Sequence, residues 1–397
     1  MTYLSPGVYV EEVSTGARPI ESVPTSIAAF VGQAPNLEAR VNEAWAVNNW
    51  SSFKREYVRE GQHSTPLSQA VFGFFENGGH RCYIVNTGPG GAIVGDSRGR
   101  KGLDLLETVD EVAIVAVPGK WDAESHDALL SHCEKMADRF AICDCPDVVR
   151  DIDSLTKVGA VPVPGRPAGE AEETAGLRPR MSNFGSYYFP CITVRDALSG
   201  TLINTYPSGY IAGIYARSDA TRGVHKAPAN ESIRGALNVT YRVTKDEQDV
   251  LNSNGVNCIR FFNKQGILVW GARTVADSSS EWRYVNVRRL FNQVEESIGN
   301  STRWVVFEPN DRTLWKSIRR DISAFLTLFW RDGALMGRSP SEAFFVKCDE
   351  ETNTSAEIDA GRVVALIGLA PVKPAEFVIF RIGQSGGGTQ IESGGGA

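Results

Sequence analysis

The chain has 397 residues, a 22% charged fraction and a formal net charge of −6 at pH 7. Such a composition is that of a globular protein with roughly two or three domains, and its mild acidity argues against a nucleic-acid partner. Met1-Thr2-Tyr3-Leu4 lacks the features of a secretory signal, and the longest strongly apolar stretch, 322–330, is too short for membrane insertion. Seven cysteines without framework spacing indicate reduced thiols and synthesis in the cytoplasm.

The first predicted element is an isolated β-strand that alternates apolar and polar positions. Its residues are Val8, Tyr9, Val10, Glu11, Glu12 and Val13. Gly16, Pro19 and Pro24 interrupt the chain after it, and no hairpin partner follows. Unpaired backbone N–H and C=O groups are costly when buried, so the strand needs a sheet edge. That edge belongs either to its own domain or to another subunit, and the pattern leaves both open.

The residues after this arm predict an α/β fold. In chain order we expect a strand at 25–32, a helix at 66–75, and strands at 81–85, 112–117 and 140–143, with a helix at 123–139 between the last two. A strand, a helical crossover and a second strand predict a parallel pair. The proline-rich segment 161–180 predicts an exposed loop.

Further along, the pattern predicts a helix, a hairpin and then a new domain. Ser208 is the expected N-cap of the helix, which Gly223 ends, and its small residues predict a closely packing face. Strands at 256–262 and 267–274 flank a turn and predict a hairpin. The domain boundary is expected at 278–280.

The last domain is predicted to hold two amphipathic helices and a hairpin. The first helix should stop at Gly299-Asn300 and the second should begin at Asn310-Asp311. Burial of the second helix's apolar stripe contributes about 1.5–3 kcal/mol per large side chain. Strands at 344–348 and 362–369 form a hairpin that is marginal alone, so we expect it to accept further strands. Its expected acceptor residues are Phe344, Phe345, Val346, Lys347, Val363, Val364, Ala365, Leu366 and Ile367.

A second isolated strand is predicted near the other end, beyond Pro371 and Pro374 and before a Gly/Ser-rich tail. Its residues are Phe377, Val378, Ile379, Phe380, Arg381 and Ile382. This strand also needs a sheet edge, in its own domain or in another subunit, because both of its faces are apolar and no partner lies nearby.

Candidate chemistry is sparse. Residues of metal-ligand type cluster only at His126, His132, Cys133, Cys143 and Cys145, whose spacing matches no common zinc pattern and favours buried thiols. We therefore expect no metal.

A hydrolytic set would combine Ser208, His225 and either Asp219 or Asp196, but no nucleophile elbow accompanies it. The Gly-rich stretch 88–95 lacks the Lys-Ser/Thr of a phosphate-binding loop. We expect no catalytic residue and no cofactor, and hence a protein that is not an enzyme.

The second helix of the last domain is basic in its first half, where the helix dipole disfavours positive charge. The residues concerned are Arg312, Lys316, Arg319 and Arg320. They indicate either an anionic partner outside the chain, or a solvated face or local pairs with Glu308 and Asp311, and these interpretations remain open.

Ordered motifs along nearly the whole chain resemble one family. They include Ser5-Pro6-Gly7-Val8-Tyr9-Val10, Phe30-Val31-Gly32, Asn77-Gly78-Gly79, Pro207-Ser208-Gly209, Lys226-Ala227-Pro228, Trp270-Gly271-Ala272-Arg273-Thr274, Val287-Arg288-Arg289-Leu290, Phe307-Glu308-Pro309-Asn310-Asp311 and Pro374-Ala375-Glu376-Phe377. This chain is similar to the contractile tail sheath proteins of myophages, R-type pyocins and related injection particles. Residues 88–188 lack diagnostic motifs.

The resemblance implies a multi-domain α/β (α+β) fold, with an N-terminal arm (1–24), an outer domain (25–275, variable at 89–189), an inner tube-facing domain (276–370) and a C-terminal arm (371–397). It implies stacked hexameric rings around an inner tube, with contraction driving the tube through a target envelope. Both arm strands would join acceptor hairpins of neighbours, and the basic helix residues would contact the tube. Implied partners are further copies of the chain, the tube protein, and baseplate and cap proteins, within a phage tail or an injection particle assembled from a cytoplasmic pool. A sheath-like cap or baseplate collar is the alternative.

Overall fold

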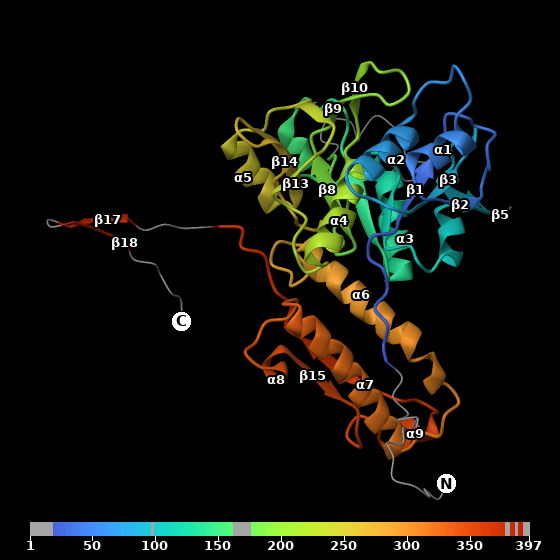
Figure 1. The fold of residues 1–397 in the computed structure, drawn as a ribbon, viewed down its shortest axis with the longest axis vertical. Coiled ribbons are helices and arrows are strands. Elements are labelled where there is room, and N and C mark those ends of the chain that lie inside the picture. Colours follow the sequence, from blue (N-terminus) through green and yellow to red (C-terminus); the bar gives the residue numbers. More distant parts are fainter. Residues whose placement is uncertain (1–18, 97–98, 162–175, 378–381, 386–387, 392–397) are drawn as a thin grey trace, which may run out of the picture.

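The computed structural model describes residues 19–96, 99–161, 176–377, 382–385 and 388–391. Figure 1 shows two bodies, a larger one built on a β-sheet and a smaller helical one, with helix α6 (Val285–Ser301) running from the first into the second. We call them the sheet body and the helical body. Among the helices described, none is both long and apolar enough to cross a membrane.

The sheet body is organised around a nine-stranded sheet in the order β11-β14-β13-β8-β7-β6-β1-β3-β2. Its strands are β1 (Ala28–Gly32), β2 (Ala44–Val47), β3 (Cys82–Asn86), β6 (Ile114–Ala116), β7 (Phe140–Asp144), β8 (Gly185–Phe189), β11 (Glu231–Ser232), β13 (Val256–Phe262) and β14 (Gly266–Val269). The central strands from β3 to β13 pair in parallel, and the antiparallel strands β2, β14 and β11 lie at the margins. The parallel strands are buried on both faces, as such sheets require.

Helices cover both faces of this sheet. One face carries α1 (Trp50–Tyr57), α2 (Pro66–Glu76) and α4 (Ser208–Arg222), and the other carries α3 (Ala123–Met136) and α5 (Lys245–Ser253). The predicted close packing of α4 is confirmed, because a Cβ added at Gly209 would lie 2.2 Å from the Ala70 carbonyl oxygen of α2. The predicted parallel pair is confirmed as β6 and β7.

Smaller elements complete the sheet body. A three-stranded sheet joins β9 (Ile192–Arg195), β10 (Leu202–Thr205) and β12 (Ala236–Val239), and a short hairpin joins β4 (Val94–Asp96) and β5 (Gly99–Gly102). Short 3₁₀ helices span Leu103–Thr108, Ile152–Leu155 and, near the helical body, Arg303–Val305.

Two helix-boundary predictions were wrong. Ser208 is the first residue of α4 rather than its N-cap, and its hydroxyl donates to Asp144 Oδ2 at 2.8 Å instead of closing the helix end. Helix α6 does not stop at Gly299-Asn300 but continues to Ser301, because the following Thr302 N–H still bonds to the Ile298 carbonyl.

The helical body is built from α6, α7 (Arg312–Arg331), the hairpin of β15 (Phe344–Lys347) and β16 (Leu366–Leu369), and the short helices α8 (Pro340–Ala343) and α9 (Ser355–Asp359). The predicted apolar stripe of α7 is confirmed. Its buried members are Leu314, Trp315, Ile318, Ile322, Phe325 and Leu326. The predicted helix start is confirmed as well, since Asp311 accepts the Leu314 N–H at 2.8 Å.

The last described strands lie at and beyond the end of the predicted C-terminal strand. The structure has β17 (Ile382–Ser385) paired with β18 (Gly388–Ile391), a hairpin in the Gly/Ser-rich tail that the sequence pattern did not predict. Residues 378–381 lie outside the described residues. In Figure 1 this hairpin projects away from both bodies.

Candidate assembly surfaces

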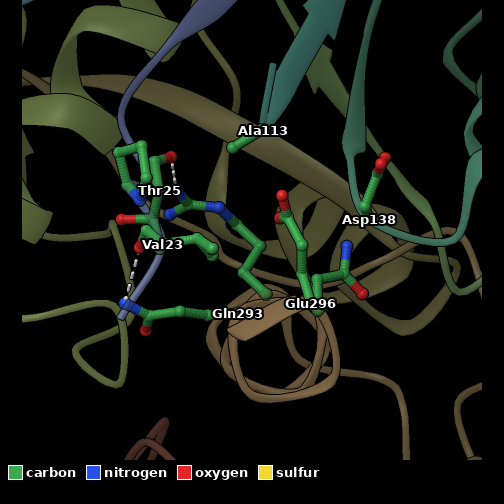
Figure 2. Close-up of a pocket in the computed structure, with 9 residues that line it drawn as sticks. Val23, Thr25, Ala113, Asp138, Gln293 and Glu296 are labelled. Carbon is green, nitrogen blue, oxygen red and sulfur yellow. Dashed lines mark hydrogen bonds between the residues drawn. The ribbon is translucent and has the colours of Figure 1, made fainter. Parts of the chain in front are cut away.

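The N-terminal arm reaches the molecule along α6. Its predicted strand, residues 8–13, lies outside the described residues, but the segment that follows is held by side chains of the helix. The Glu21 N–H donates to Ser301 Oγ at 3.1 Å, and the Val23 N–H donates to Ser297 Oγ at 3.0 Å. Figure 2 shows Gln293 reaching the same segment, where its amide donates to the Val23 carbonyl at 3.2 Å. The base of the arm is therefore fixed to α6 through its backbone.

A buried ion pair joins α6, α4 and the arm. Arg289 of α6 donates to both carboxylate oxygens of Asp219 in α4, at 3.0 and 2.6 Å, with side-chain exposures of only 3% and 5%. The same guanidinium donates to the Thr25 carbonyl at 2.9 Å, a bond drawn in Figure 2, and lies 4.7 Å from the Tyr215 ring centroid. The Thr25 hydroxyl donates to Asp219 at 2.6 Å. Removal of any member leaves buried polar groups without partners.

Two acidic residues line a narrow pocket where α6 meets the sheet body. Figure 2 shows them, Glu296 of α6 and Asp138, which precedes β7, among the residues that line this pocket. Burial, reinforced by the charge of Asp138, raises the pKa of Glu296 to about 7. Asp138 itself accepts a 2.6 Å hydrogen bond from the buried Arg139, and Asn292 donates to the Arg139 carbonyl at 3.3 Å.

The C-terminal arm is held at its base in a similar way. Glu376 accepts hydrogen bonds from Arg273 of the sheet body at 2.9 and 2.5 Å and from the Tyr284 hydroxyl at 3.3 Å. Asn286, at the start of α6, donates to the Val372 carbonyl at 3.1 Å. Phe377, which follows Glu376 in the chain, has a relative exposure of 74%. The described part of the arm base thus ends in an exposed residue directly after a strong ion pair.

The predicted acceptor hairpin exists but is shorter than expected. Phe344–Lys347 pair with Leu366–Leu369, while Val363, Val364 and Ala365 precede the second strand. Asn353 explains the difference, because its side chain accepts from the Val364 N–H at 2.7 Å and donates to the Val364 carbonyl at 3.0 Å, in place of a strand partner.

One face of this hairpin packs on the helical core and the other is open. Phe345 and Leu366 are 54% and 52% exposed, respectively. Among the described residues, no third β-strand pairs with β15 or β16. An isolated antiparallel bridge between Leu335 and Pro371 lies two residues beyond the end of β16. Two strands alone make a marginal sheet.

The basic residues of α7 are exposed, as a solvated face requires, and the ion pairs found differ from the expected local pairs. Arg312 pairs with Glu350 at 2.6 Å and Arg320 with Asp321 at 3.0 Å, rather than with Glu308 or Asp311. Lys316 and Arg319 have no ion pair among the described residues. Both are available to an acidic surface outside the chain.

The candidate hydrolytic residues do not form one site. Ser208 and Asp219 are the first and twelfth residues of α4, roughly 16 Å apart along its axis. Asp219 forms its ion pair with Arg289, and Asp196 accepts hydrogen bonds from the hydroxyl and the N–H of Ser199 at 2.7 and 2.8 Å.

The candidate metal-ligand residues are packed inside the sheet body. His126 Nε2 lies 3.0 Å from the Asp144 carbonyl oxygen, and burial lowers the pKa of His126 to about 4. The seven cysteines are all buried and free. Among the described residues, no group of three or more His, Cys, Asp or Glu side chains is arranged to hold a metal ion.

Three residues that hold the arms, Arg289, Arg273 and Glu376, belong to motifs shared with the family, but the motifs did not predict this role. Arg289 and Asp219 are 70 positions apart in the chain, and Arg273 and Glu376 are 103 apart. Helix or strand periodicity does not relate residues at such distances.

Comparison with known proteins relates this architecture to one family. The models of the phage tail sheath protein central domain and of the phage tail sheath C-terminal domain match residues 99–275 and 277–385. A chain of the contracted PVC sheath complex, from an extracellular contractile injection system, is 30% identical, with a TM-score of 0.76 over 97% of this chain and 99% of that one. A chain of the six-fold symmetrised anti-feeding prophage baseplate is 29% identical, with a TM-score of 0.71 over 97% and 100%.

The tail sheath protein of Salmonella phage ViI is 27% identical over 300 residues, which are 72% of this chain and 46% of that protein. The chain therefore spans about half the length of this curated relative. The fold is that of a structural subunit of contractile sheaths, which confirms the predicted α/β (α+β) multi-domain class. The chain belongs to the phage tail sheath family.

Proposed function

We propose that this chain is the repeating subunit of a contractile sheath, which polymerises as stacked hexameric rings around an inner tube and contracts to drive the tube through a target envelope. The observation that carries the proposal is that the described bases of both terminal arms are held by specific side chains, at Glu21 and Val23 in one arm and at Glu376 in the other. Such anchors transmit force from an arm to the body it belongs to.

The hairpin of β15 and β16 is the proposed receiver of the arms. Strand 8–13 of one neighbour and the C-terminal strand region from 377 onward of another would add to its edges and extend a marginal two-stranded sheet. Main-chain ladder bonds persist while the joined bodies rotate about the arm segments beyond the anchored residues, before Glu21 and after Glu376. Neighbouring subunits could then slide and turn without losing their links.

The exposed basic side chains of α7 are the proposed tube contact. Lys316 and Arg319 carry most of this role, because Arg312 and Arg320 have acidic partners within the chain. Reversal of the charges at Lys316 and Arg319 should reduce co-sedimentation of sheath with tube, and more strongly at low salt. Unchanged attachment would remove this assignment.

We propose an arm at 1–24, an outer domain at 25–275, an inner domain at 276–370 and a C-terminal arm at 371–397; a boundary between the two matched family domains, at 275–277, supports the division between outer and inner domain. The protein acts mechanically and needs neither enzyme activity nor a cofactor, with contraction driven by a metastable extended lattice. Assembly proceeds from a cytoplasmic pool onto a baseplate.

Val10→Pro tests the arm directly, because proline removes a ladder hydrogen bond from the proposed strand. Val148→Pro is the matched control, in an exposed loop of the sheet body. Electron microscopy of purified protein should show striated cylinders for the wild type and the control, and folded monomers for Val10→Pro. Long tubular polymers from the Val10→Pro protein would refute the proposed exchange.

A baseplate collar is the second candidate, since a chain of a six-fold symmetrised baseplate matches over nearly its full length. Quantitative mass spectrometry of purified particles separates the two. A closed ring requires about six copies, whereas a shaft requires on the order of hundreds.

A further inference from the structure

The loop between α6 and α7 exposes a phenylalanine in an unusual backbone conformation. Phe307 has a relative exposure of 102%, and its neighbour Val306 is 64% exposed. The φ angle of Phe307 is +70°, in the left-handed region that bulky residues rarely adopt. The loop is held in this shape by backbone hydrogen bonds from Val306 to Arg303 and from Glu308 to Val305. Strained, fully exposed aromatic residues are typical of binding sites.

A cleft that suits such a residue lies at the opposite end of α7. It has a volume of about 460 Å³ and opens between the end of α4, the base of the N-terminal arm and the last turns of α7. Its apolar lining residues are Ile20, Ala220, Val224, Phe325, Leu328, Phe329 and Ala334, and polar residues line the remainder, with Arg222, His225 and Asp332 among them. Leu328 is 53% exposed although it belongs to the amphipathic helix that forms the core.

Phe307 cannot reach the cleft of its own chain. It precedes the N-cap Asp311, whereas the cleft begins near Phe325, and a helix of 20 residues is about 30 Å long. A projection and a complementary cleft at opposite ends of one chain produce head-to-tail contacts, which propagate into open helical polymers.

We propose that Phe307 of one copy inserts into the cleft lined by Phe325, Leu328 and Phe329 of the next copy. This inference rests on the proposed polymerisation, and it adds a second link that does not involve the arms. The cleft lies between the two bodies, so an inserted ring couples the position of one subunit to the joint of its neighbour.

Charge complementarity with Arg222 favours a second copy as the occupant, and the acidic Asp332 lies in the same lining. Glu308 follows Phe307, is exposed, and has no ion pair among the described residues. Arg222 lines the cleft at the end of α4, is exposed, and likewise has no ion pair in the described part of the chain. Insertion of Phe307 would bring these opposite charges to the rim of the same contact.

The direct test places the photoreactive residue p-benzoylphenylalanine at position 307, which keeps an aromatic ring there. Sheaths are assembled around tubes, irradiated and digested, and the adducts are mapped by mass spectrometry. Adducts on residues 325–329 of a second sheath chain are expected. Adducts on the tube protein, or only on other sheath surfaces, would overturn the inference.

A disulfide test gives an independent readout. Phe307→Cys and Leu328→Cys would be the exposed cysteines, because the seven native ones are buried. The double variant should give a ladder of covalent multimers on a non-reducing gel after mild oxidation, whereas Phe307→Cys paired with the exposed control Met181→Cys should give none. If the double variant forms normal cylinders but gives no ladder of multimers, the inference is overturned and the proposed function stands. If the wild type forms no cylinders, the proposed function itself is contradicted.

Charge reversal completes the test. Glu308→Arg and Arg222→Glu should each reduce the yield of cylinders several-fold, and their combination in one chain should restore it. Equal loss in the single and double variants would contradict a direct contact between the two residues.

Discussion

Substitution of Arg289 by methionine tests how the two bodies are joined. Methionine keeps most of the length of the side chain but removes the charge that faces Asp219, which is 5% exposed at its side chain. The carboxylate then retains the Thr25 hydroxyl as its remaining side-chain donor. Removal of one partner of a buried pair costs about 3–5 kcal/mol, because the other charge stays buried without compensation.

The free energy of unfolding should be measured by urea denaturation of the monomeric chain at low concentration. Arg55→Met is the matched control, since Arg55 pairs with Glu56 at 3.3 Å but its side chain is 72% exposed, and loss of a surface pair costs about 0–1 kcal/mol. The double variant Arg289→Met/Asp219→Asn should recover part of the loss, which would measure the coupling. A loss for Arg289→Met no larger than that of Arg55→Met would refute the reasoning.

Two other substitutions test the anchors of the arms and hairpin. Gly368→Val places a Cβ 2.1 Å from the Phe345 ring, so it should destabilise the hairpin by about 1–3 kcal/mol. Hydrogen exchange of the backbone amides in β15 should then become faster. An unchanged exchange rate would show that the ring moves aside without an energetic cost. Glu376→Gln weakens the bond to Arg273, so limited proteolysis of the C-terminal arm should accelerate, while Glu350→Gln, in a pair that is 63% exposed on the acidic side, should leave the rate unchanged. Equal cleavage rates in all three proteins would contradict the proposed anchor.

Local physical signals were sufficient for most of the fold. The apolar stripe of α7 and its N-cap Asp311 were predictable because helix periodicity and capping act within a few residues. The close approach of α4 to α2 followed from its small residues, Gly209 among them. The parallel pair β6 and β7 followed from the strand–helix–strand spacing.

The contacts that hold the arms were not predictable in the same way. The tertiary fold brings Arg289 to Asp219 and Arg273 to Glu376. The residues near a charged side chain in the sequence do not indicate which distant residue it will pair with. The start of the second acceptor strand was predicted too early for a related reason. The Asn353 side chain binds the backbone of Val364 there, in place of a neighbouring strand. Polar side chains that substitute for secondary structure leave no periodic trace.

The neighbouring acidic residues Glu296 and Asp138 make the contact between α6 and the sheet body pH-dependent. The ordinary pKa of Glu296 is 4.5, and burial with the nearby Asp138 charge raises it to about 7 in the folded chain. The charge of Arg139 lowers this pKa and the charge of Asp110 raises it. Between pH 4.5 and 7 the folded state therefore binds more protons than the unfolded state, so stability falls as pH rises through this window.

Glu296→Gln should remove this dependence, because glutamine stays neutral at every pH. After allowance for solvent screening of a half-buried group, the wild type should lose about 1–2 kcal/mol relative to Glu296→Gln between pH 5 and pH 7.5. Urea denaturation of both proteins at several pH values measures the difference, with Glu295→Gln as a control at the adjacent, more exposed position of α6. Parallel stability curves for the wild type and Glu296→Gln would show that the two carboxyl groups are solvated independently, and the contact between α6 and the sheet body would then carry no proton-linked energy.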